Sequence, residues 1–174
     1  MRRLSLNARL AQDTASSAEI EVVLLMVEHP ALTAPIRLST DNADRISTEP
    51  LIYGTRSTWM GSNPLTEPFR WILASAQVPS DLEDAPAAAT IVLEAVTNEI
   101  ATLLRSFGNR ATVHMAVVLA SSPDLIELEY RDLRLISAEG DAGEVSLSLS
   151  REPIEEERFP WLRFTKERFP GVHR

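Results

Sequence analysis

The stretch that decides the fold runs from Thr112 to Ile136, TVHMAVVLASSPDLIELEYRDLRLI. Its first nine residues alternate apolar with other side chains, which is typical of a β-strand, and Ser-Ser-Pro then ends the strand. The second half predicts the longest strand of the chain. Its apolar positions slip by one residue between Tyr130 and Leu133, and such a slip indicates a β-bulge near Arg131 and Asp132.

The segments before and after this stretch predict further strands. Residues 20–27, IEVVLLMV, are almost continuously apolar, as in a strand that is covered on both faces. Val145, Leu147 and Leu149 alternate with serines after a turn bracketed by two glycines, which predicts a half-solvated antiparallel strand. Shorter strands are predicted at residues 35–38, 51–53, 69–75 and 89–95. The polar run 39–44 is predicted to be a turn region, and Gly54 is expected to end the strand at 51–53.

Two helices are predicted. The stronger one covers residues 97–107, where apolar residues recur at helical spacing and Gly108 follows. Residues 4–17 predict a weaker amphipathic helix with Leu6 and Leu10 on one side, which we expect to pack on a partner or across the sheet.

Together these elements predict a mainly β protein of the α+β class. We expect an antiparallel β-barrel or sandwich of seven to nine strands, with the helix at residues 97–107 packed on it. The predicted organisation is an N-terminal helical extension (residues 1–18), the β domain (19–157) and a C-terminal arm (158–174).

The C-terminal arm is predicted to be extended and to need a groove. Glu-Arg-Phe-Pro begins at Glu157 and again at Glu167, and its prolines favour extended backbone. Five basic residues and one Glu give residues 158–174 a charge of +4, so the net charge of −8 leaves −12 on the rest of the chain. A basic, aromatic arm is suited to bind an acidic copy of the same body. Its candidate interface residues are Phe159, Trp161, Arg163, Phe164, Arg168 and Phe169.

Residues 54–68 predict a long loop with Trp59 and Met60 at its tip. An exposed Trp-Met pair is unfavourable unless something covers it. The pair is therefore either tucked under the domain or a contact with a partner, and the sequence leaves both alternatives open.

No residue pattern in the chain indicates catalysis. The three His residues, at positions 29, 114 and 173, lack metal-ligand spacing, and there is no phosphate-binding loop, GxSxG motif or Cys. We expect His29 to be hydrogen-bonded in a turn and His114 to face solvent or an interface. The acidic cluster at 152–157 lacks the Gly and Asx residues of a calcium loop. We therefore expect no enzyme activity, cofactor or metal.

Charge and hydropathy limit the classes of partner that the protein can bind and the compartment in which we expect it. The net charge of −8 argues against general nucleic-acid binding. No apolar run is long enough for a membrane span, and residues 1–17 lack the apolar core of a signal peptide. We expect the chain to be made and folded in the cytoplasm.

Three segments, EVVLLMVEHPALTAPIRLSTD, VVLASSPDLIELEY and EPIEEERFPWLRFTKERFPG, resemble a family of short minor tail proteins of tailed phages and prophages, a domain of unknown function from the tail-tip region. The matching positions are His29 to Asp41, Val118 to Asp124 and Pro160 to Gly171. Lys166 stands where the family's arm commonly has Pro, and residues 54–68 look like an insertion, so no role is carried over to that loop.

The resemblance implies a fold of the phage tail-tube type and a structural role in the virion. The expected role is a ring at the tail tip, similar to distal tail and hub rings, that joins the tail tube to the hub and is assembled in the bacterial cytoplasm. Expected partners are other copies of the chain, six or alternatively three, and the neighbouring tail-tube, tape-measure and hub proteins. The alternative is a carbohydrate- or receptor-binding module of the tail tip that uses Trp59 and Trp71.

Overall fold

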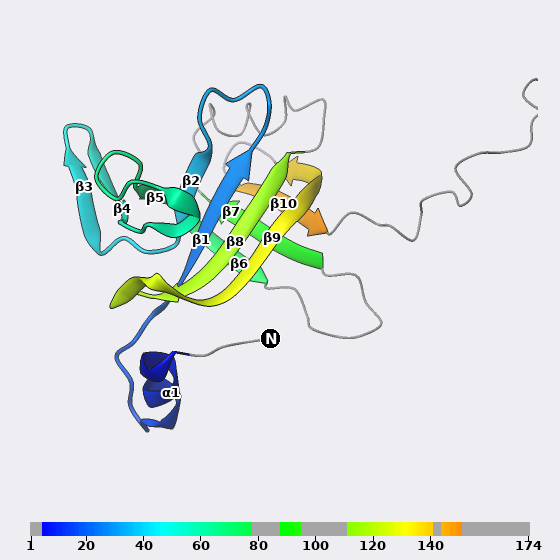
Figure 1. Cartoon of the computed structure of the whole chain (residues 1–174). Coiled ribbons are helices and arrows are strands. Elements are labelled where there is room, and N and C mark those ends of the chain that lie inside the picture. The colour runs from blue at the N-terminus through cyan, green and yellow to red at the C-terminus, as the bar shows by residue number, and fades with distance from the viewer. Residues whose placement is uncertain (1–4, 78–87, 95–110, 141–143, 151–174) are drawn as a thin grey trace, which may run out of the picture.

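The computed structural model describes residues 5–77, 88–94, 111–140 and 144–150, and these ranges contain one helix and ten strands (Figure 1). No helix among these residues is long and apolar enough to cross a membrane. In chain order the elements are α1 (Leu6–Asp13), β1 (Glu21–Glu28), β2 (Ile36–Ser39), β3 (Asp44–Thr48), β4 (Leu51–Thr55), β5 (Phe69–Trp71), β6 (Leu73–Gln77), β7 (Ala88–Glu94), β8 (Thr112–Leu119), β9 (Ser122–Gly140) and β10 (Glu144–Ser150).

All ten strands belong to one sheet, in the order β3-β4-β5-β2-β1-β8-β9-β10-β7-β6. Neighbouring strands are antiparallel except β2 and β5, which run parallel. The prediction of a mainly β fold is therefore confirmed, but the sheet is mixed rather than purely antiparallel. It also has more strands than the seven to nine expected.

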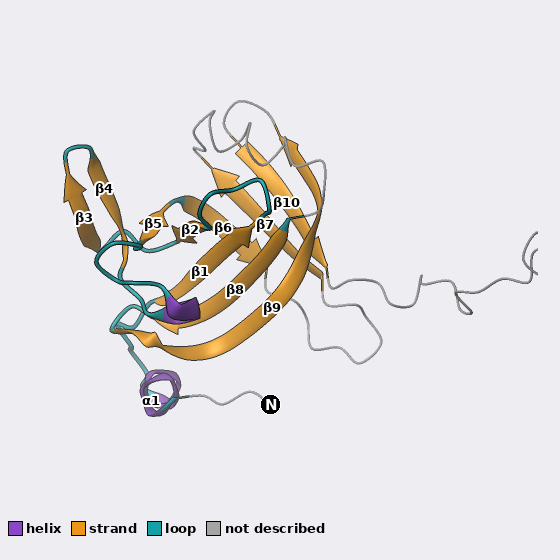
Figure 2. Cartoon of the chain, turned by 45° about the horizontal axis from the view of Figure 1, so that its top comes forward, coloured by secondary structure: helices purple, strands orange, loops and turns teal. Residues whose placement is uncertain are grey.

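The sheet curls because one continuous segment belongs to both of its ends. Only Ile72 separates β5 from β6, yet β5 pairs with β2 and β4, whereas β6 pairs with β7 near the opposite end of the strand order. The two ends of the sheet must therefore approach each other, and the result is the half-barrel seen in Figure 2. This is one curled sheet and not a sandwich of two sheets.

The interior of the half-barrel is filled by one apolar cluster. The alternation predicted for the last strand is confirmed, since Val145, Leu147 and Leu149 are buried in this cluster while the serines between them are partly exposed. Antiparallel pairing with β9 and β7 on either side holds β10 in this register. The other buried members of the cluster are Leu25, Val27, Leu38, Ile72, Ala89, Ile91, Leu93, Ala111, Val113, Met115, Tyr130, Leu133 and Leu135.

β1 and β8 are buried on both faces. The prediction for β1 is confirmed, because its second face belongs to another cluster on the outside of the sheet. For β8 the expected alternation is wrong, since every residue from Val113 to Leu119 is buried. The outer cluster consists of Val22, Leu24, Met26, Trp59, Phe69, Ala116 and Val118.

The predicted β-bulge is present in β9. Val113 pairs with Leu133 and Met115 with Tyr130, so the single residue His114 lies opposite both Arg131 and Asp132. Asp132 has a left-handed backbone, with φ of 58°.

A second irregularity in β9 was not predicted. Val117 pairs with Leu128 and Val118 with Ile126, which leaves Glu127 as an extra residue in β9. The alternation of Ile126, Leu128 and Tyr130 in the sequence predicts that Ile126 faces the core, and this is wrong, since Ile126 is exposed while Glu127 is buried.

Several predicted boundaries also change. Residues from Asp44 onward form β3, although the turn region was expected to reach Asp44. Gly54 lies within β4 and does not end it; a Cβ there would lie 1.9 Å from the carbonyl oxygen of Phe69, so the close approach of β5 requires glycine. The single strand predicted at residues 69–75 is divided at Ile72, and Ser122 and Pro123 begin β9.

The N-terminal helix is confirmed, but it is shorter than predicted. Ser5 caps α1, because its hydroxyl oxygen accepts a hydrogen bond of 3.1 Å from the Ala8 N–H. Leu6 and Leu10 are 81% and 68% exposed, so their face does not pack on the described part of the sheet. In both views α1 lies outside the curled sheet. The helix predicted at 97–107 and the arm at 158–174 lie outside the described residues.

Candidate functional site

The loop of residues 56–68 covers the outer faces of β1 and β8. Trp59 begins a single 3₁₀ turn, Trp59–Gly61, and only 3% of it is exposed. Its ring lies 5.7 Å from the ring of Phe69, centroid to centroid, within the outer cluster. Met60 and Gly61 have positive φ values of 55° and 72°, which direct the chain back after Trp59.

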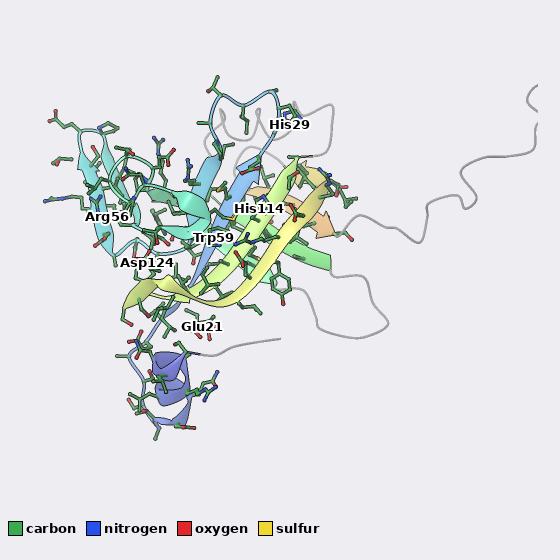
Figure 3. All side chains as sticks on the ribbon, in the orientation of Figure 1. Glu21, His29, Arg56, Trp59, His114 and Asp124 are labelled. Carbon is green, nitrogen blue, oxygen red and sulfur yellow. The ribbon has the colours of Figure 1, made fainter. Side chains whose placement is uncertain are left out.

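Hydrogen bonds fasten this loop to the first half of β9; Figure 3 labels Trp59 of the loop and Asp124 of β9. The Ser57 hydroxyl donates to the carbonyl of Pro123 over 2.8 Å. Asp124 Oδ1 accepts from both the backbone N–H and the hydroxyl of Thr58, at 2.7 and 2.8 Å. The indole N–H of Trp59 donates to Glu129 Oε1 over 2.7 Å.

These hydrogen-bond donors shift the pKa values of the two carboxylates, Asp124 and Glu129. The hydrogen bond from the Thr58 N–H holds the pKa of Asp124 below its ordinary value, against the opposing effect of partial burial. Burial alone would raise the pKa of Glu129, but hydrogen bonds from Trp59 and Arg131 and the charge of Arg131 lower it overall. Both groups are therefore held in the charged form that binds the loop.

These contacts decide between the two alternatives for the loop tip. Trp59 is tucked under the domain, and Met60 packs partly buried against the same cluster. The candidate interface role of Trp59 lacks the exposed surface that it would need. At the other end of the loop, Arg37 donates from Nε to the Ser62 hydroxyl and forms an ion pair of 3.2 Å with Glu67.

His114 lies inside the protein. The alternation of its strand predicted that it faces solvent or an interface, and this prediction is wrong. Only 4% of it is exposed. Its Nδ1 accepts the backbone N–H of Asp132 over 3.2 Å, and its Nε2 lies 3.8 Å from Glu28 Oε2. The ring therefore satisfies the backbone donor that the bulge would otherwise leave unpaired. The signal that was missed is the run AVVLA after His114, which resembles the doubly covered run of β1.

An open depression of about 460 Å³ lies beside this bulge, between the β1–β2 connection and the start of β8. His29 is at its edge and its Nδ1 accepts the Ala31 N–H over 3.1 Å, which confirms the predicted turn role. Among the described residues, no three His, Asp or Glu side chains are grouped to hold a metal ion.

Several large apolar side chains are exposed on the described part of the chain. One group lies on strands β4, β5 and β6, and the β3–β4 hairpin projects from the half-barrel in Figure 1. A second group lies on α1 and around the β8–β9 hairpin, where the Ala120 N–H donates to the carbonyl of Ile20. The first group is Leu51, Tyr53, Trp71 and Leu73, and the second is Leu6, Leu10, Ile20, Leu125 and Ile126.

The residue that caps α1 is attached to β9 through a buried carboxylate, that of Glu127. Glu127 Oε2 accepts the backbone N–H of Ser5 over 2.8 Å, so the extra residue of β9 holds the residue that caps α1. Sequence reasoning missed this contact because Glu127 stands in an apparently regular alternation. The predicted interface residues of the arm, Phe159, Trp161, Arg163, Phe164, Arg168 and Phe169, lie outside the described residues.

The chain matches no protein-family model and no curated protein.

Proposed function

We propose that this protein is a structural subunit of a phage tail tip, where several copies form a ring between the tail tube and the hub. The observation that carries the proposal is the set of exposed apolar side chains on two projecting parts, the β3–β4 hairpin and α1. Apolar surface that is presented on projections, away from the core, is typical of proteins that are completed by neighbours. The proposed location of the ring, at the tail tip of a phage, comes from the resemblance of the sequence to phage minor tail proteins.

The rigid attachment of the loop at residues 56–68 supports a scaffold role. Trp59, Asp124 and Glu129 fix this loop to the sheet, so the outer face of β1 and β8 is closed. The surfaces left for partners are then the projections and the sheet edges. A subunit of a ring uses two such different surfaces on one chain to bind the copies on either side.

Two measurements test this function. Mass spectrometry of purified phage particles from a host carrying the gene should detect the chain as a virion component. Negative-stain images of the purified full-length protein should show closed rings of six copies, or of three. Particles that lack the chain, combined with a protein that forms no ring, would contradict the proposal.

The carbohydrate-binding alternative depends on Trp71 alone, because Trp59 is buried. Trp71 is 42% exposed in β5, and an exposed tryptophan on a sheet can stack on a sugar ring. A glycan array with the full-length protein and with Trp71→Ala distinguishes the two functions. The structural role predicts no glycan signal that depends on Trp71.

A further inference from the structure

The ring of His114 is held in the β9 bulge in its neutral form. Its Nδ1 accepts the backbone N–H of Asp132 over 3.2 Å, and a ring nitrogen that accepts a hydrogen bond carries no proton. The proton of the neutral ring therefore lies on Nε2, which is 3.8 Å from Glu28 Oε2. In the imidazolium both ring nitrogens are donors, so this arrangement fits the neutral ring alone.

The conformation of the bulge is coupled to this ring. Only 4% of His114 is exposed, and Asp132 beside it has a left-handed backbone with φ of 58°. Such a backbone is unfavourable for most residues other than glycine and persists where the surrounding contacts hold it. The hydrogen bond from the Asp132 N–H to the ring is one of these contacts, and solvent hardly reaches it.

Charged side chains approach the ring from both neighbouring strands. Glu28 of β1 is 3.8 Å away, and Glu129 of β9 also attracts a positive charge on His114. Both carboxylates therefore favour the imidazolium. The other charged residues of β9 beside the bulge, of which the two basic ones oppose that charge, are Arg131, Asp132 and Arg134.

A second proton on the ring has opposing effects. Imidazole side chains gain this proton between about pH 8 and about pH 5. The proton goes to Nδ1, where it meets the Asp132 N–H, and two donors cannot form a hydrogen bond. Attraction to Glu28 and Glu129 offsets this loss. The response to acid is therefore a change of partners at the bulge, with little change in the stability of the whole fold.

We propose that His114 is a pH-sensitive switch in the β9 bulge, whose neutral ring holds the Asp132 N–H and whose protonated ring releases it and pairs with Glu28. Release allows Asp132 to leave its left-handed backbone. Because a bulge sets the bend and twist of its strand, the direction of β9 beyond Asp132 then depends on pH. The switch goes beyond the proposed assembly and does not depend on it, since all of its groups belong to one chain.

Hydrogen–deuterium exchange of the full-length protein tests the switch, because mass spectrometry reads exchange in any state of assembly. Fragmentation of the peptide around the bulge resolves the Asp132 amide, and each rate is divided by that of an unstructured peptide at the same pH. From about pH 8 to about pH 5, the protection of this amide should fall about ten-fold or more, as expected for the loss of one hydrogen bond. The amides of β10 should keep their protection.

Two variants assign the response to the ring and its partner. His114→Asn replaces Nδ1 by an amide oxygen that can accept the same N–H and does not titrate, so the protection of Asp132 should no longer depend on pH. Glu28→Gln removes the carboxylate that faces Nε2 and should move the midpoint of the release to lower pH by about 0.5 unit. His29→Asn, in the turn next to Glu28, is the matched control and should leave the response unchanged.

Equal protection of Asp132 at both ends of this pH range would overturn the proposal. A pH response that persists in a folded His114→Asn variant would do the same. Should that variant fail to fold, the comparison of wild type with Glu28→Gln decides, and an identical midpoint in the two proteins contradicts the switch.

Discussion

At the scale of single residues, Trp59 is the side chain on which the loop of residues 56–68 depends. It combines a buried ring, a contact with Phe69 and a hydrogen bond to Glu129. A residue with these contacts cannot also be the partner contact that an exposed Trp-Met pair would indicate. The Trp-Met pair in the sequence could not show this, because the strands that bury Trp59 are distant in the chain.

The first prediction concerns this residue. Trp59→Ala should lower the free energy of unfolding by about 3–5 kcal/mol, because it removes a buried aromatic ring and leaves a cavity. Trp71→Ala is the matched control and should cost about 1 kcal/mol or less, since Trp71 is largely at the surface. Urea denaturation followed by circular dichroism measures both. Equal losses for the two variants would show that Trp59 is not part of the core.

The second prediction is a pH dependence that comes from Asp124 and Glu129. Both have a pKa below the ordinary values of 3.8 and 4.5 in the folded protein. A carboxylate with a lowered pKa stabilises the fold above its unfolded pKa, and this contribution is lost as the pH falls through the folded value. We therefore expect the denaturation midpoint to be steady from pH 7 to about 5 and to fall below about pH 4.

The variant Asp124→Asn/Glu129→Gln is the control for this pH dependence. It should be less stable than the wild type at pH 7, and its midpoint should fall less on acidification. A double variant with the same acid response as the wild type would assign the effect to other carboxylates.

At the scale of elements, the bulge of β9 was predictable and its function in packing was not. The slip of apolar phase between Tyr130 and Leu133 indicated the extra residue, because a strand has a fixed period of two. The ring of His114 that accepts the Asp132 N–H could not be predicted, since it needs the register of β8 against β9.

The third prediction tests this bulge through Asp132, whose φ of 58° is unfavourable for most residues. Asp132→Val should lower the free energy of unfolding by about 1–2 kcal/mol, whereas Asp132→Gly should leave it unchanged or raise it slightly. Thr90→Val, an exposed position of β7 with ordinary strand backbone, is the control and should be tolerated. Chemical denaturation of the three variants gives the comparison. Equal tolerance of valine at positions 132 and 90 would contradict the bulge geometry.

Other elements show why sequence patterns were not sufficient to predict every strand and its pairing. β3 reads DRIST and lies at the edge of the sheet, where no apolar alternation is needed. FRWILAS reads as one strand, but the Ile72 N–H donates to the carbonyl of Ser39 at the point where the segment passes from one end of the sheet to the other. The parallel pairing of β2 and β5 likewise depends on contacts between distant residues.

At the scale of the whole molecule, the described strands form a half-barrel from which the β3–β4 hairpin projects (Figure 1). The interior cluster is formed by strands from residue 21 to residue 150. The fourth prediction concerns the C-terminal arm, which lies outside the described residues.

Deletion of residues 158–174 should leave a folded body that no longer assembles. The expected result is a cooperative denaturation transition of the truncated protein, together with the loss of large particles. Raised salt should weaken assembly of the intact chain, because the proposed contact joins an arm of charge +4 to a body of charge −12. A truncated protein that unfolds would place the arm in the core of its own chain.

The central claim is that this chain acts as one of several identical subunits, and mass photometry of the purified full-length protein tests it most directly. The account predicts a main species with the mass of six copies, or of three, which falls to single copies when residues 158–174 are removed. A full-length protein that remains a single copy over the whole accessible concentration range would contradict the account.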